Sequence, residues 1–130
     1  MNEKLGLLSQ LIALSAVDGY VSDQQIGLIQ KIGNLMGIKN PDILELFRVP
    51  ADFIPPADHM ERIVQFQRMM LIINVDQDVM PEEVEFVRLA SIKMGLNPDA
   101  VKEALMRMHQ FPNSAIPPED LLRIFSKYMN

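Results

Sequence analysis

The 130-residue sequence contains no cysteine, and this absence removes several kinds of chemistry at once. Without thiolates there is no zinc–sulfur site, no iron–sulfur cluster, no cysteine nucleophile and no redox switch. An excess of positive charge is missing too, because the formal net charge is −5 and acidic residues outnumber basic ones in both halves. A protein that binds a phosphate backbone needs a basic surface, so we expect no nucleic-acid partner.

Long apolar runs are also absent. The longest, at 69–73, is far too short to cross a bilayer, and the first residues lack the pattern of a secretory signal. We therefore expect no membrane span and a cytoplasmic location, and we leave open a peripheral association with a membrane. Hydrophobic residues make up 48% of the sequence and charged residues 22%. That balance is typical of a folded domain, and the length fits one domain over 1–130.

What the sequence does contain is a series of amphipathic segments separated by turn residues, which predicts an all-α fold. Apolar residues recur at spacings of three and four, and no segment shows the alternation of a strand. The nine prolines stand at expected helix starts or in linkers. We expect about seven helices, beginning near residues 2, 22, 40, 58, 81, 97 and 118.

Capping residues set several of these boundaries. Ser22 followed three residues later by Gln25 predicts a capping box. Gly37 stops the same helix in the usual way, because glycine adopts the left-handed conformation without strain. The sequence Asn-Pro-Asp at 40–42, repeated at 97–99, predicts a helix start with asparagine as the N-cap and proline at the first helical position.

An internal duplication is the most informative feature. A shift of 58 residues lays 69–105 on 11–47, and the Val-Asp turn at 17–18 then meets the one at 75–76. Each copy consists of helix, acidic turn, helix, glycine stop, Asn-Pro-Asp and helix. Any two pairs of amphipathic helices share apolar spacing, which explains why the apolar positions of the two copies match. It does not explain why the turns match as well. We therefore predict two similar three-helix units related by a pseudo-two-fold axis, with a C-terminal helix closing one side.

The two acidic turns are the candidate metal site. An EF-hand is excluded, because its spacing would place Leu14 and Ala16 at the first two carboxylate positions. A looser site remains, since a two-fold that brought the turns together would gather oxygen ligands suited to calcium or magnesium. The alternative is that these acids only shape the turns and complement a helix dipole. The five carboxylates are Asp18, Asp76, Asp78, Glu82 and Glu83.

Catalytic motifs are lacking. There is no G-x-S-x-G nucleophile motif, no glycine-rich phosphate loop and no pair of histidines at ligand spacing. We predict no catalytic or cofactor-binding residue and a non-enzymatic protein. Ten methionines are present, and most fall at core spacing. Met80, Met106 and Met129 are the ones whose exposure would indicate an adaptable partner surface.

The first acidic turn, A-V-D-G-x-V, followed by a long amphipathic helix that ends in M-G-I, resembles the tellurite-resistance TerB-like family. The second copy, with V-D-x-D-V and a P-E-E helix start, is similar to the same pattern. The resemblance covers nearly the whole chain. It implies a small α-helical domain without enzymatic activity, tied to stress and tellurite resistance through protein contacts and divalent-cation binding. Asp18 and Gly19 match the first motif, and Asp76, Glu82 and Glu83 match the second.

Three functions follow as expectations. The first is a protein-interaction module in a stress or tellurite-resistance context, with a homodimer left open; it predicts an exposed apolar patch containing methionine or phenylalanine. The second is a regulatory domain that binds a divalent cation at the acidic turns. The third is a hydrolase built on carboxylates of those turns, which needs two acids in one pocket with separated pKa values.

Overall fold

The computed structural model describes residues 2–129, with side chains from residue 3 onward. Over these residues the chain forms helices and no strand, which confirms the prediction of an all-α fold with about seven helices. The α-helices are α1 Asn2–Ser15, α2 Asp23–Leu35, α3 Asn40–Arg48, α4 His59–Asn74, α5 Pro81–Lys93, α6 Pro98–Arg107 and α7 Pro118–Lys127, and two short 3₁₀ helices are η1 Met108–Gln110 and η2 Pro112–Ser114.

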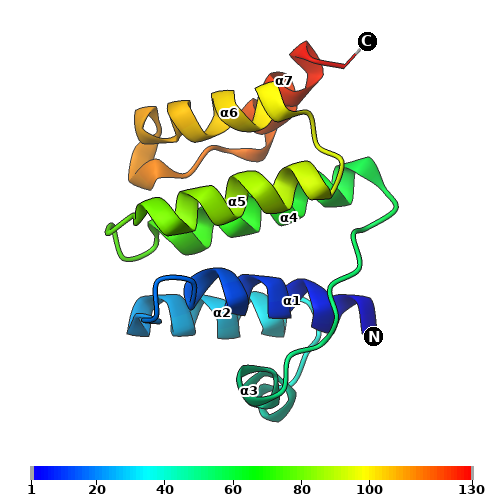
Figure 1. Cartoon of the computed structure of the whole chain (residues 1–130), viewed down its shortest axis with the longest axis vertical. Helices are drawn as coiled ribbons and strands as arrows, with labels where there is room; N and C mark the ends of the chain where they lie inside the picture. Colours follow the sequence, from blue (N-terminus) through cyan, green and yellow to red (C-terminus); the bar gives the residue numbers. More distant parts are fainter. Residues whose placement is uncertain (1, 130) are drawn as a thin grey trace.

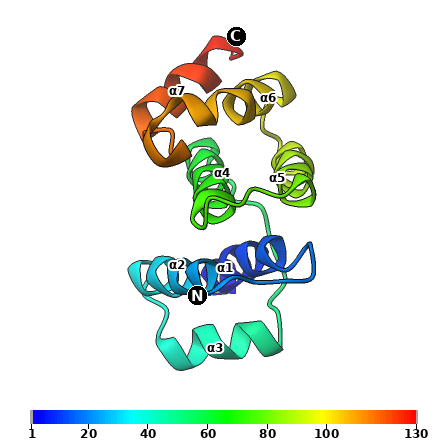
Figure 2. The same cartoon turned by 90° about the vertical axis from the view of Figure 1, so that its left-hand side faces the viewer.

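The helices form four tiers (Figures 1 and 2). α3 lies at one end, followed by the pair α1 and α2, the pair α4 and α5, and finally α6 with α7. A linker over residues 49–58 runs along one edge and connects α3 to α4 across the middle of the molecule. No helix among the described residues has the length and apolar character that crossing a bilayer requires.

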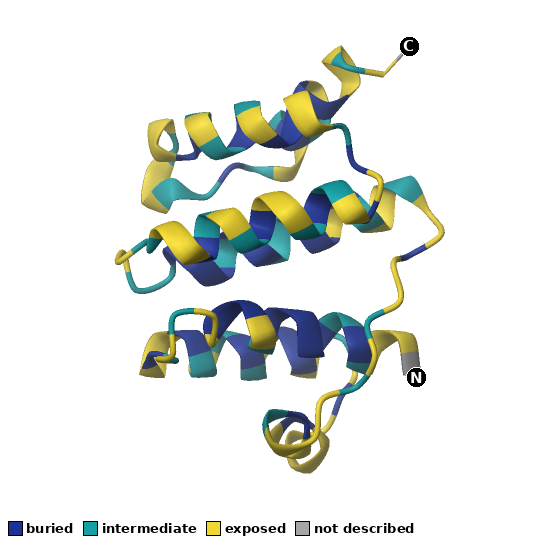
Figure 3. Ribbon diagram, in the orientation of Figure 1, coloured by how far each residue is buried: buried dark blue, intermediate teal, exposed yellow. Residues whose placement is uncertain are grey.

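The core lies between the tiers, and Figure 3 shows the outer sides of α3 and α6 largely exposed. α4 contributes most to it, since Phe66, Met69, Ile72 and Ile73 are fully buried. The second half of α4 is apolar on nearly all sides because α1, α2, α5 and α7 all pack against it. The ring of Phe66 meets that of Phe125 edge to face, with 5.6 Å between centroids, and this contact joins α4 to α7.

The capping predictions are largely confirmed. Ser22 and Gln25 form the reciprocal capping box at the start of α2. Gly37 has a φ of +85°, and Asn97 caps α6 by accepting hydrogen bonds from two backbone N–H groups. The prediction for Asn40 is wrong: α3 begins at Asn40 itself, Lys39 is the N-cap, and no side chain caps this end.

The two acidic turns have the same local geometry. Asp18 Oδ1 accepts a hydrogen bond from the backbone N–H two residues further on at 3.2 Å, and Asp76 Oδ1 does the same at 3.1 Å. The residue after each aspartate is left-handed, with a φ of +87° at Gly19 and +60° at Gln77. Residues 58 apart therefore share turn type, although only the first copy uses glycine for it.

The third helices of the two halves pack differently. α3 contacts both other helices of its half, α1 and α2. Its counterpart α6 contacts α5 and α7, and it is α7, rather than α6, that packs against α4. The C-terminal helix is held there by Glu103 of α6, which accepts hydrogen bonds from Arg107, Lys127 and the hydroxyl of Tyr128. These donors lower the pKa of Glu103 to about 2, with Lys127 the largest contribution.

The linker is fixed to α1 at two points. Ser9 Oγ accepts a hydrogen bond from the backbone N–H of Ala51 at 2.9 Å. One turn earlier, the α-carbon of Gly6 lies so close to the backbone of Asp52 that a β-carbon would collide with the Asp52 carbonyl oxygen. Glycine is required at residue 6 because a backbone segment, rather than a flexible side chain, occupies the space.

Gly6→Ala should lower the free energy of unfolding by about 1–3 kcal/mol, because the linker must move away from α1. Gly27→Ala is the matched control, since a β-carbon there meets nothing within 4 Å and α2 is helical at that point. It should raise stability by about 0.5–1 kcal/mol through helix propensity. Urea unfolding of both variants measures the difference, and equal effects would contradict the packing described.

Candidate functional site

Two features of the structure bear on function: a buried polar corner between α2 and α5, and an apolar groove between α1 and α5. The first lies beside the acidic turns, where the sequence predicted a metal site. The second joins segments that are far apart in the sequence, and no sequence motif marked it.

The polar corner is centred on Glu83, whose side chain is only 2% exposed. Its Oε1 accepts a hydrogen bond from the backbone N–H of Met80 at 3.1 Å, which closes the start of α5. Its Oε2 accepts a hydrogen bond at 2.7 Å from Nε2 of Gln25, and Gln25 Oε1 in turn accepts one from the Ser22 N–H. Two helix starts are therefore joined through the side chains that cap them.

Burial raises the pKa of the Glu83 carboxyl above its ordinary value, because the charged form loses solvation. The hydrogen bonds from Met80 and Gln25 act in the opposite direction, since they stabilise the charged form. The negative charges of Asp18 and Asp76 add a smaller rise, so both turns lie close enough to act on this carboxyl.

The structure places the five predicted site residues unequally. Glu83 is buried, Asp18 and Asp76 are half-buried beside it, and Asp78 and Glu82 are exposed. Within residues 2–129, no three acidic or histidine side chains come together in an arrangement that could hold a metal ion. The oxygens of Glu83 are already taken by protein donors. These residues thus do not form a ready-made cage for calcium or magnesium, and cation binding at the turns stays a prediction.

Residues 58 apart meet in two places. Gln25 and Glu83 are one such pair, and the other is Leu7 and Gln65, where Gln65 Nε2 donates to the Leu7 carbonyl oxygen at 3.0 Å. The shift of 58 residues aligns Gln25 with Glu83, so in the sequence an amide stands where a symmetric pair of metal sites would need a second carboxylate. The structure shows it instead as the hydrogen-bond donor to the buried carboxylate.

The groove is lined by α1, α5 and the linker between α3 and α4, and its volume is about 570 Å³. Its one charged lining residue is Lys93, at the end of α5, which has no ion-pair partner among the described residues. Most of the remaining lining is apolar, and its walls include Ala13 of α1, Phe53 of the linker, and Phe86, Leu89 and Ala90 of α5.

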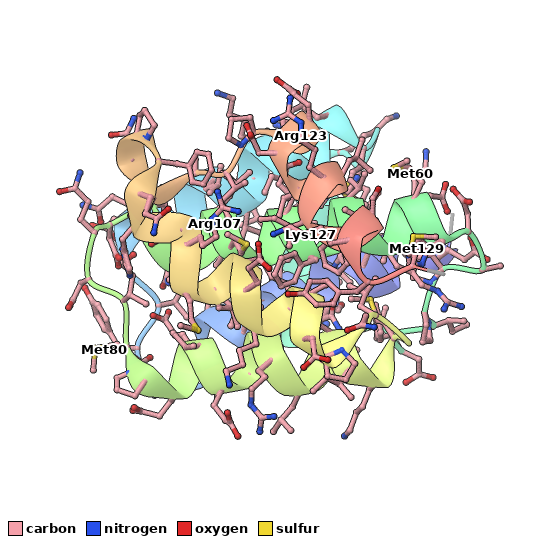
Figure 4. The ribbon with its side chains drawn as sticks, turned by 90° about the horizontal axis from the view of Figure 1, so that it is seen from above. Met60, Met80, Arg107, Arg123, Lys127 and Met129 are labelled. Carbon is pink, nitrogen blue, oxygen red and sulfur yellow. The ribbon has the colours of Figure 1, made fainter. Side chains whose placement is uncertain are left out.

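The three methionines that the sequence singles out differ in exposure. Met106 and Met129 are exposed, whereas Met80 is half-buried. Figure 4 shows Met80 at the opposite end of the molecule from Met60 and Met129. In the groove, Phe53 and Phe86 supply the aromatic rings.

Comparison of the chain with family models, with curated proteins and with solved structures finds no match. The resemblance to TerB-like proteins accordingly stays a prediction that rests on the turn motifs.

Gln25→Ala should lower the free energy of unfolding by about 2–3 kcal/mol, because it leaves Oε2 of the buried Glu83 carboxylate without its donor and also removes a helix cap. The matched control is Gln24→Ala, an exposed neighbour that should change stability by less than about 0.5 kcal/mol. Chemical denaturation measures both. A small effect of Gln25→Ala would mean that the corner is not a stabilising contact.

The raised pKa of Glu83 also predicts a pH dependence. A carboxyl with a higher pKa in the folded state holds its proton better there, so its contribution to stability is present below the unfolded pKa and is lost as the pH rises through the folded pKa. From about pH 4.5 upward, the unfolding free energy of the wild type should therefore fall relative to that of Glu83→Gln.

Glu82→Gln is the control for this measurement, because Glu82 is exposed and its substitution removes the same charge. Its stability should follow the wild type across the same pH range. Parallel curves for the wild type and Glu83→Gln would show that Glu83 is not the group that titrates.

Proposed function

We propose that the chain is a TerB-like protein-interaction module that holds an amphipathic helix of a partner protein in the groove between α1 and α5. The single observation that carries this proposal is the groove itself: an open apolar channel with phenylalanine side chains in its walls and one unpaired cation at its edge. Helix-in-groove recognition uses such a surface, with anchors spaced three and four residues apart along the bound helix.

The shape of the groove favours a helix over a flat partner surface. Its two long walls are themselves helices, and Ala13 and Ala90 are small residues on opposite walls. Small residues allow a third helix to approach closely, as in the packing of any helix between two others. Leu89 is 45% exposed and Ile54, beside Phe53 in the linker, is 56% exposed, so apolar surface continues past the rim.

The charge of the groove indicates the polarity of the partner. Lys93 has no ion-pair partner within residues 2–129 and stands at one end of an otherwise uncharged lining. A partner helix with an acidic residue beside its apolar face would complement it. We expect that a chain without the Lys93 charge would mainly lose its selectivity for a partner helix with an acidic residue.

The proposal also includes two related three-helix units arranged about a pseudo-two-fold axis. Matching turn geometry at residues 58 apart supports it, as do the Gln25–Glu83 and Leu7–Gln65 hydrogen bonds between equivalent positions. An axis that relates two units brings equivalent residues face to face where it passes. The stress or tellurite-resistance context rests on the family resemblance alone.

A photo-crosslinking amino acid at position 89, introduced in the native host, tests the groove. We expect cross-links to one protein segment with apolar residues at helical spacing and an adjacent acidic residue. A peptide of that segment should bind the purified full chain, Lys93→Glu should weaken the binding about tenfold, equivalent to roughly 1.4 kcal/mol, and reversing the acidic residue of the peptide should restore it.

Position 44 is the control, because Leu44 is exposed on α3 and does not line the groove. The same label there should not capture that segment. Identical cross-links from both positions would refute groove docking, as would cross-links from position 89 only to lipid or to a second copy of this chain.

A further inference from the structure

A polar hollow lies at the end of the molecule opposite the linker, away from the groove. The α4–α5 turn forms one side and the segment through η1 and η2 forms the other; in Figure 1 both lie at the left. Its volume is about 400 Å³, and its polar lining consists of Asn74, Gln77, His109, Asn113 and Ser114, with Val79 and Phe111 as apolar walls. A second hollow of about 260 Å³ adjoins it, shares Asn74, Gln77 and Asn113, and is otherwise apolar.

Backbone strain is concentrated around this hollow. Among residues 2–129, the non-glycine residues with positive φ are Gln77 at +60°, Asn113 at +55° and Ser114 at +54°, and all three line it. Each costs roughly 1–2 kcal/mol relative to a right-handed conformation. Such strain persists only where the surroundings enforce it, and in proteins it clusters at ligand sites. Here it turns two amide side chains and a hydroxyl toward one small volume.

Several hydrogen-bonding groups in the hollow are unused. Asn74 is 93% buried, and its Nδ2 donates to the Met70 carbonyl oxygen at 2.8 Å and to the Met108 sulfur at 3.4 Å; its Oδ1 accepts from no described residue and is not sealed from solvent. Gln77 and Asn113 are exposed, so their side-chain amides face solvent at the hollow. Water can satisfy these groups in the free protein, and a ligand that binds here would take the place of that water.

The lining is also uncharged. No Asp, Glu, Lys or Arg lines either hollow, and the one titratable side chain is His109, whose Nδ1 lies 3.1 Å from Ser114 Oγ. A charged ligand would lose its hydration there without gaining a counter-charge. A neutral ligand carries no charge that needs a counter-charge, and its hydrogen-bonding groups can pair with those of the lining.

We propose that this hollow binds an uncharged small molecule with a planar amide edge, in which a donor and an acceptor stand side by side. An asparagine or glutamine amide has the same pair of groups and matches such an edge with two hydrogen bonds. Primary carboxamides and nucleobases both present this edge. Phe111 offers an apolar wall to the planar ring, and the adjoining hollow accepts an apolar substituent.

The test is an NMR titration of the full ¹⁵N-labelled chain with nicotinamide, uridine and adenosine at millimolar concentrations. We expect saturable shifts confined to residues 74–79 and 109–115 and to the side-chain amides of Asn74, Gln77 and Asn113. Nicotinamide alone would identify a carboxamide ligand, and the nucleosides alone would identify a nucleobase. Nicotinic acid and uridine monophosphate should bind more weakly than their neutral counterparts, because no cation lines the hollow.

Gln77→Gly and Asn113→Gly separate binding from folding. Glycine accepts the left-handed backbone, so the melting temperature should rise or stay the same while the affinity falls about tenfold, equivalent to roughly 1.4 kcal/mol. Asn34→Ala, which removes an exposed amide on α2, should leave the affinity unchanged. The proposal is overturned if none of the three compounds gives saturable shifts, or if the shifts persist unchanged in both glycine variants.

Discussion

One buried hydrogen bond, from Gln25 to Glu83, joins the two halves of the chain at the starts of α2 and α5. A carboxylate that is 2% exposed is costly to bury, and it is tolerated because two donors reach it from two directions. One donor belongs to the start of its own helix and the other to the start of the equivalent helix in the first half. The same two side chains therefore cap their helices and fix the spacing between them.

This corner ties the start of α5 to the first half, and α5 also packs against α1. α1 and α5 stand side by side, and the space between them that the linker does not fill is the groove. The linker itself is positioned by Gly6 and Ser9, which allow it to lie against α1. The groove proposed as a docking surface thus depends on the Gln25–Glu83 contact at the start of α5 and on Gly6 in α1. The amide-lined hollow depends instead on left-handed residues of the second half; at the equivalent turn of the first half, Gly19 takes the place of Gln77 and adopts this conformation without strain.

Much of the fold could be predicted from the sequence because its signals are local. Apolar spacing gave the seven helices, and the Ser22–Gln25 capping box formed as expected. Local reasoning failed at Asn40, where the chain enters the helix one residue earlier than the Asn-Pro-Asp pattern predicts.

Sites that form through tertiary packing could not be predicted from the sequence. The five acids at the turns were grouped by alignment, yet only Glu83 is buried, because burial depends on what α2 places against α5. The groove and the hollow join residues from elements far apart in the chain, so no motif could mark them. The shift of 58 was the one long-range signal in the sequence, and it does align the two residues that meet at the corner.

The central claim is that Gln25 and Glu83 stabilise the fold as a pair, and a double-mutant cycle with Gln25→Leu, Glu83→Leu and the double variant tests it most directly. If the pair is real, each single variant leaves one buried polar group without its partner, and the double variant is less destabilised than the sum of the two by about 2 kcal/mol. Additive effects within about 0.5 kcal/mol would contradict the account.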